Sequence, residues 1–219
     1  MTLENSYDLK LINKIKNKLV TRKQTVAVGE SVTAGHLQVA LSQATDAMKF
    51  FQGGITAYNL GQKARHLVVD PIHALACNCV SATIAETMAI HAAKLFSSDW
   101  GISATGYASP NPENNIKTPF AYFSISFRGK TMITEKILAK PSTAIGVQFL
   151  YTDHILRKFL GQLSGKELKS GTFFRPAKVQ TSYSSVFSMA SRKTQTSSTS
   201  RLIFPHAFNA DDVILFRFR

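Results

Sequence analysis

The stretch Gly53–Lys63, G-G-I-T-A-Y-N-L-G-Q-K, decides the predicted fold together with the earlier stretch Val26–Gly35, V-A-V-G-E-S-V-T-A-G. Each begins as a short apolar run typical of a strand, breaks at small or polar residues, and continues as a predicted helix. A strand that ends in such a turn and opens a helix points free backbone N–H groups at whatever lies above the sheet. Two such turns on neighbouring strands would face one crevice, where open α/β sheets bind ligands.

The remaining elements are expected to surround this crevice. Apolar spacing predicts helices over residues 7–21, 36–42, 59–67, 71–76 and 143–163, with Ser81 as the N-cap of one more, and strands over 25–28, 53–58, 100–107, 119–127 and 131–138. Residues 108–118 read as a polar loop dense in Pro and Asn. This order predicts a three-layer α/β/α sandwich with a mixed sheet.

The segment from Lys166 to Arg219 differs in composition from everything before it. It contains the Ser/Thr-rich run S-Y-S-S-V-F-S-M-A-S-R-K-T-Q-T-S-S-T-S-R and shows no sustained hydrophobic period. Such segments cannot bury enough apolar surface to offset the entropy of ordering. We therefore predict a folded domain over residues 1–165 and a disordered tail over 166–219. The tail is either a functional basic extension or the product of a shifted reading frame.

Composition narrows the classes of partner. The formal net charge is +13, and the tail, with nine Lys and Arg against three acidic residues, carries +6 of it, which leaves +7 for residues 1–165. The basic residues of that part are scattered and form no stripe interleaved with aromatics, so nucleic-acid binding rests on net charge alone. The sequence contains no apolar run of about 18 residues, which is the length that would predict a membrane span. No signal peptide is recognised, and Cys77 and Cys79 read as reduced thiols, so we expect a cytoplasmic protein.

The sequence contains four blocks in the order G-E-S-V-T-A-G, G-G-I-T-A-Y-N-L-G-Q-K, V-S-A-T-I-A-E-T-M-A and A-T-G-Y-A-S-P. They resemble the C-terminal domain of the CinA family, the nicotinamide-nucleotide amidase of the PncC type, and the resemblance covers residues 7–163. It implies an α/β/α fold and hydrolysis of the carboxamide of nicotinamide mononucleotide to nicotinate mononucleotide and ammonia, without a metal. We expect no cofactor, a small nucleotide substrate and a homo-oligomer.

Amide hydrolysis needs an activated oxygen, donors for the oxyanion, and a proton for the leaving ammonia. A serine with a neutral lysine as base meets this need if burial or nearby positive charge lowers the lysine pKa. The candidate catalytic residues are Ser31 on the first turn, Lys63 on the helix that Asn59 opens, and Tyr58 as proton relay or oxyanion donor. The candidate substrate-binding residues are Glu30, Thr33, Gly35, Asn59, Thr105 and Gly106.

Each candidate also has a simpler structural interpretation. Ser31 and Thr33 would cap the following helix, Lys63 would be a solvated helix lysine, and Tyr58 would be a half-buried aromatic at a strand end. Glu30 would orient its neighbours rather than act as a catalytic carboxylate. The histidines show no metal-ligand spacing.

Three departures from the family pattern favour an alternative function. Met48 stands where the family has a serine, the loop after Thr105 reads T-G-Y-A-S-P-N-P-E-N with fewer glycines, and the family's arginines are absent from residues 140–148. A CinA-like domain that has lost catalysis and serves as a nucleotide-binding or assembly module would tolerate these changes.

Overall fold

A computed structural model describes residues 7–140 and 142–165 of the 219-residue chain. The predicted tail over 166–219, and with it the predicted domain boundary at residue 165, lies outside the described residues. In the described ranges no helix combines the length and apolarity of a membrane-spanning segment.

The helices are α1 (Leu9–Thr21), α2 (His36–Ser42), α3 (Leu60–Leu67), α4 (Pro71–Ala76), α5 (Ala82–Leu95) and α6 (Ala144–Leu163), with short 3₁₀ helices η2 (Ala47–Lys49) and η3 (Pro112–Asn114). The strands are β1 (Val26–Glu30), β2 (Phe51–Thr56), β3 (Trp100–Gly106), β4 (Phe120–Phe127) and β5 (Lys130–Leu138). A side-chain cap starts α5 as the sequence predicts: Ser81 Oγ accepts from the N–H of Ile84 at 3.1 Å.

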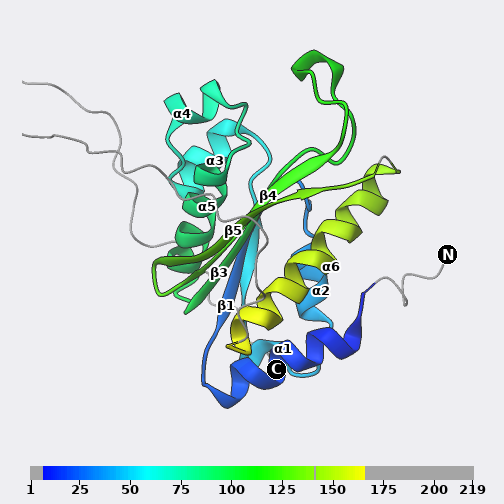
Figure 1. The fold of residues 1–219 in the computed structure, drawn as a ribbon. Coiled ribbons are helices and arrows are strands. Elements are labelled where there is room, and N and C mark those ends of the chain that lie inside the picture. Colours follow the sequence, from blue (N-terminus) through cyan, green and yellow to red (C-terminus); the bar gives the residue numbers. More distant parts are fainter. Residues whose placement is uncertain (1–6, 141, 166–219) are drawn as a thin grey trace, which may run out of the picture. The chain divides into compact units, whose positions relative to one another are not determined.

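The five strands form one mixed sheet in the order β2-β1-β3-β4-β5. Strand β1 pairs in parallel with β2 and β3, while β4 runs antiparallel to both β3 and β5. Helices α3, α4 and α5 lie on one side of this sheet and α1, α2 and α6 on the other (Figure 1). The three-layer α/β/α sandwich with a mixed sheet is therefore confirmed.

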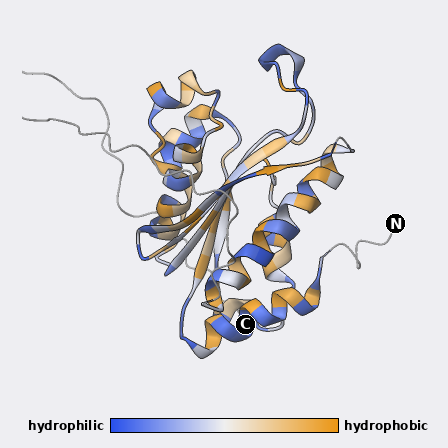
Figure 2. Cartoon of the chain, viewed as in Figure 1, coloured by the Kyte–Doolittle hydropathy of each residue, from blue (hydrophilic) through white to orange (hydrophobic). Residues whose placement is uncertain are grey.

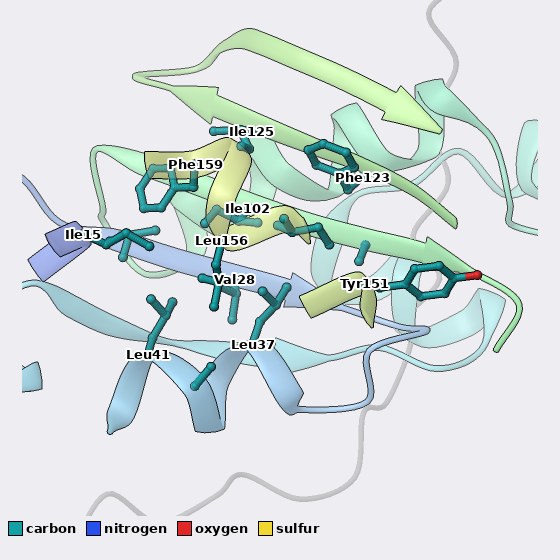
Figure 3. Close-up of a cluster of buried hydrophobic side chains, with 14 of the residues drawn as sticks. Ile15, Val28, Leu37, Leu41, Ile102, Phe123, Ile125, Tyr151, Leu156 and Phe159 are labelled. Atoms are coloured by element: carbon teal, nitrogen blue, oxygen red, sulfur yellow. The ribbon is translucent and has the colours of Figure 1, made fainter. Parts of the chain in front are cut away.

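The larger hydrophobic cluster fills the space between the sheet and α1, α2 and α6. Figure 3 shows it in close-up, with Val28, Ile102 and Phe123 from the strands meeting Leu37 of α2 and Leu156 of α6. Figure 2 shows the same distribution along the ribbon, with hydrophobic residues on the strands and a hydrophilic loop after β3. Burial of side chains of this size contributes roughly 1.5–3 kcal/mol each.

On the opposite face, small residues let α5 approach the sheet closely. A Cβ atom added to Gly101 of β3 would lie 1.9 Å from the carbonyl oxygen of Ala89, so only glycine fits under the helix. Ser103 of β3 donates its hydroxyl to the carbonyl of Ala85, which ties the same strand to α5. Strand β3 is thus held firmly beneath the helix layer that carries part of the site.

Several strand boundaries differ from the prediction, with the largest shifts at β2 and β1. β2 begins at Phe51 and ends at Thr56 rather than spanning 53–58, because Phe51 already pairs with Val26. β1 begins one residue later than predicted and continues to Glu30. Tyr58 therefore lies beyond its strand, in the connection to α3.

Candidate active site

A cavity of about 580 Å³ opens where the parallel strands β1, β2 and β3 end. This volume lies in the range of roughly 300–1,000 Å³ that is usual for small-molecule sites. Its wall is made by the turn after β1, the start of α3, the α4–α5 connection, the end of β3 and the start of α6. The lining residues include Ser31, Val32, Tyr58, Asn59, Leu60, Lys63, Leu75, Asn78, Cys79, Gly106, Tyr107, Asn111, Ala144 and Gln148. The crevice predicted above the sheet is therefore present.

Lys63 is the most unusual side chain in this wall, since it is a lysine only 3% exposed. Its Nζ donates a hydrogen bond to Thr105 Oγ1 at 3.1 Å, and Thr105 Oγ1 in turn donates to the carbonyl oxygen of Cys79 at 2.8 Å. No described carboxylate forms an ion pair with Lys63. A buried amine thus has one neutral hydrogen-bond partner and a cavity beside it.

Burial lowers the pKa of Lys63 from its ordinary value, because the charged ammonium loses hydration that no carboxylate replaces. The thiols of Cys79 and Cys77 act in the opposite direction, since a thiolate would favour the ammonium. Desolvation is the larger effect. A lysine with a lowered pKa holds more neutral amine near neutral pH, and neutral amine is the form that can take a proton.

The start of α3 explains why Lys63 reaches the cavity. Asn59 is the N-cap, and its Oδ1 accepts from the N–H of Gln62 at 3.0 Å. The first intrahelical bond then runs from the N–H of Lys63 to the carbonyl of Asn59. Lys63 and Leu67 form the buried face of this helix. The cap therefore fixes the register that turns Lys63 inward.

Ser31 occupies the turn between β1 and α2 and is buried in the cavity wall. Its N–H donates to the carbonyl of Ala104 at 2.9 Å, which ties the turn to β3. The carbonyl oxygen of Ser31 accepts a hydrogen bond from the N–H of Ala34 at 3.1 Å. Ala34 and Gly35 both have a positive φ, at 49° and 102°. The turn is therefore a fixed part of the backbone that places Ser31 beside the cavity.

Glu30 is fully buried, but it faces α2 instead of the cavity. Its Oε2 accepts from the N–H groups of Gly35 and Leu37 at 3.1 and 3.0 Å, and its Oε1 accepts from that of Gln38 at 3.0 Å. The N-cap of α2 is Gly35, which offers no side-chain cap. A carboxylate of the protein itself thus fills the helix end where an external anion would otherwise bind.

The other sequence candidates divide between the cavity and its surroundings. Ser31, Tyr58, Asn59, Lys63 and Gly106 line the cavity, whereas Glu30, Thr33, Gly35 and Thr105 do not. Thr33 is fully buried, and its hydroxyl has no partner among the described residues. Thr105 lies behind the wall, where it binds Lys63. Tyr58 is 72% exposed at the cavity rim, so the expectation of a half-buried aromatic was wrong.

The sequence analysis did not identify the part of the cavity wall that Asn78 and Tyr107 form. Asn78 Nδ2 donates to the hydroxyl of Tyr107 at 2.8 Å and joins the α4–α5 connection to the loop after β3. The Tyr107 ring packs against Phe120 with centroids 5.5 Å apart, and its carbonyl accepts from the Tyr151 hydroxyl at 3.1 Å. The aromatic at the end of the T-G-Y motif was the only sequence signal for this wall.

The positions at which the sequence differs from the family pattern can be located in the structure. Met48 lies on η2, is 87% exposed and is not among the cavity residues. Ala144 and Gln148 of α6 line the cavity. Within the described cavity wall, Lys63 is the only residue of the types Lys, Arg, Asp and Glu. Across residues 7–140 and 142–165, no cluster of three or more His, Cys, Asp or Glu is arranged to hold a metal ion.

The chain is a three-layer α/β/α domain with a buried lysine beside a cavity at the carboxyl ends of parallel strands, which is the place where open α/β sheets usually bind ligands. The family model of the CinA C-terminal domain matches residues 8–154. The chain belongs to the CinA C-terminal domain family, as the sequence motifs indicated.

Relatives and solved structures agree with this family. A CinA-like protein of Picosynechococcus sp. is 38% identical over 103 residues, which cover 47% of this chain and 25% of that protein. A CinA-like protein of Prochlorococcus marinus subsp. pastoris is 31% identical over 144 residues, or 65% of this chain and 33% of that protein. The chain thus spans about a quarter to a third of the length of these relatives.

A competence or damage-inducible protein from Enterobacter asburiae superposes with a TM-score of 0.65 at 25% identity and covers 70% of this chain and 96% of that structure. A CinA-superfamily protein from Klebsiella pneumoniae superposes with a TM-score of 0.66 at 21% identity, covers 74% of this chain and 99% of that structure, and shows likeness of fold.

Proposed function

We propose that the domain hydrolyses the carboxamide of nicotinamide mononucleotide to nicotinate mononucleotide and ammonia. The observation that carries this proposal is the buried amine of Lys63, bound to one neutral hydroxyl and lining the same cavity as Ser31. A desolvated lysine beside a serine is one of the ways in which proteins activate a hydroxyl nucleophile. The family resemblance supplies the substrate class.

In the proposed reaction the Ser31 hydroxyl oxygen attacks the carboxamide carbon while Lys63 Nζ takes the hydroxyl proton. The oxyanion accepts a hydrogen bond from a first-turn N–H group of α3. Asn59 satisfies the N–H groups of Gln62 and Lys63, so the candidate donor of this turn is the N–H of Leu60, which lines the cavity. The Lys63 ammonium then donates its proton to the amide nitrogen, the C–N bond breaks, and ammonia leaves. Water releases the acyl group from Ser31 by the same steps in reverse.

The nucleotide's phosphate is assigned to the mouth of the cavity at α6. This 20-residue helix is capped by Thr143, whose Oγ1 accepts from the N–H of Gly146 at 3.2 Å. The first N–H groups of the helix remain available, and Ala144 lines the cavity. A helix N-terminus favours an anion by typically 0.3–1 kcal/mol where it is exposed. The aromatic ring of Tyr107 offers a wall for the pyridine ring.

The test is ammonia release from nicotinamide mononucleotide by the purified chain. The proposal expects release that Ser31→Ala and Lys63→Met abolish. The matched controls Ser42→Ala and Lys94→Met change exposed residues of α2 and α5 and should retain it. Absence of release from the wild-type chain, or release that survives Lys63→Met, would overturn the proposal.

A second candidate is a domain that binds the nucleotide without hydrolysing it. One observation favours it: no arginine is present among the described cavity residues, whereas Met48 lies exposed outside the cavity and does not alter its wall. Calorimetry that detects nucleotide binding, together with an ammonia assay that detects no turnover, would establish this function. A homo-oligomer stays a prediction, and light scattering on the full chain tests it.

A further inference from the structure

The hydrogen bonds around Lys63 define which way its amine is bound. The Thr105 hydroxyl carries one proton, and that proton is donated to the carbonyl oxygen of Cys79 at 2.8 Å. Thr105 Oγ1 can therefore only accept from Lys63, so Nζ donates an N–H across the 3.1 Å contact. A neutral amine has two N–H bonds and one lone pair. Its lone pair is consequently not used by Thr105.

The surroundings of the amine give it no carboxylate partner. Lys63 forms no ion pair with a described carboxylate, and the rest of the described cavity wall contains no Lys, Arg, Asp or Glu. An ammonium group here would have little to replace its hydration. A nucleophilic nitrogen thus lies beside a cavity of about 580 Å³ that a small molecule can enter.

We propose that Lys63 is a covalent binding site for small aldehydes, which it captures as an imine. The nitrogen lone pair attacks the carbonyl carbon, the C=O π electrons move to oxygen, and a proton passes from nitrogen to that oxygen to give a carbinolamine. Loss of the hydroxyl group with the second nitrogen proton releases water and leaves a C=N bond to Nζ. The step is a condensation and needs no oxidant or reductant.

The residues that line the cavity favour an aromatic aldehyde. Tyr107 forms part of the wall, and it is fixed by its ring contact with Phe120 and by the Tyr151 hydroxyl on its carbonyl. Leu60 and Val80 add apolar surface to the same cavity. Aromatic pairs of this kind contribute roughly 0.5–1.5 kcal/mol beyond the area that they bury. An aldehyde on a six-membered ring would therefore lie against Tyr107 while its carbonyl reaches Lys63.

Pyridine-3-carboxaldehyde is the probe. The full chain is incubated at neutral pH with one equivalent of the aldehyde and sodium cyanoborohydride, which reduces the imine to a stable secondary amine. Intact mass spectrometry is expected to show a single adduct, and peptide mapping is expected to place it on Lys63. The adduct should disappear in Lys63→Met and persist in Lys94→Met. In concentrated urea the labelling of the wild-type chain should spread over many lysines.

An adduct spread over surface lysines in the folded wild-type chain, or a folded chain in which Lys63 stays unlabelled, would overturn this inference. The mapping of the wild-type chain decides it even if the Lys63 variant does not fold. The inference is independent of the proposed hydrolysis: labelling of Lys63 without ammonia release from the nucleotide would leave it standing and reject the amidase.

Discussion

Removal of the Glu30 carboxylate should unfold α2 from its N-terminus. The carboxylate accepts three backbone N–H groups of that helix at 3.0–3.1 Å, and each hydrogen bond to a charged group contributes roughly 1.5–3 kcal/mol. Water can rehydrate part of the exposed N–H groups in Glu30→Ala, because Gly35 and Gln38 are only half-buried. We therefore expect Glu30→Ala to lower the free energy of unfolding by about 4 kcal/mol, a large part of the roughly 5–15 kcal/mol of a typical domain.

Glu30→Gln is the matched control. A glutamine with its oxygen at the Oε2 position keeps the bonds to Gly35 and Leu37 and loses the one to Gln38. Glu30→Gln should therefore lower the free energy of unfolding by about 2 kcal/mol. Urea unfolding followed by the fluorescence of Trp100, the single tryptophan, measures both variants. A Glu30→Ala chain within about 1 kcal/mol of wild type, with an unchanged denaturant dependence, would refute the assignment of Glu30 as the cap of α2.

Lys63→Met should make the folded domain more stable at neutral pH. Burial lowers the pKa of Lys63 in the folded state below its ordinary value of 10.5, so the unfolded state binds more protons than the folded state. The free energy of unfolding of the wild-type chain therefore rises with pH until the pH reaches 10.5. The difference in the free energy of unfolding between Lys63→Met and wild type, measured by urea titration, should therefore become smaller from about pH 7 to pH 9.5. A difference that stays constant over this range would contradict this linkage. Gly101→Ala should lower the free energy of unfolding by about 3 kcal/mol or more, because its Cβ would lie 1.9 Å from the Ala89 oxygen. A decrease of less than about 1 kcal/mol, measured by thermal unfolding, would show that α5 can move away from β3. Deletion of residues 166–219 should leave the thermal midpoint unchanged, and a fall of many degrees would show that the tail docks.

The starts of α5 and α3 could be predicted to the residue, whereas α1, predicted from residue 7, begins at Leu9 after its N-cap Asp8. Ser81 and Asn59 each accept from an N–H three residues later, which is a contact that the sequence displays directly. The start of α2 was different, because its cap is Glu30, which lies five to eight residues before the N–H groups that it binds. Ser31 and Thr33 were the local candidates, and neither side chain caps this helix. Local rules cannot identify a cap that the fold brings in from a strand end.

The candidate site shows the same limit. Ser31 and Lys63 could be placed at the crevice because each follows a strand whose carboxyl end must open there. The contact between Asn78 and Tyr107 joins residues 29 positions apart, and no local pattern announces it. The burial of Lys63 depended on Thr105 and the Cys79 carbonyl, which only the packed structure brings together. The motifs thus located the site, and tertiary contacts determined its chemistry.

The charge of Lys63 is the point on which both proposals depend. The direct measurement is an NMR titration of the chain with ¹³C-labelled lysine side chains, in which the Lys63 signal is assigned by its loss in Lys63→Met. We predict that the Lys63 Cε resonance titrates at a lower pH than those of the exposed lysines, because burial opposes its ammonium form. A Lys63 signal that titrates together with the exposed lysines, or above them, would show that the amine stays charged and would contradict the account.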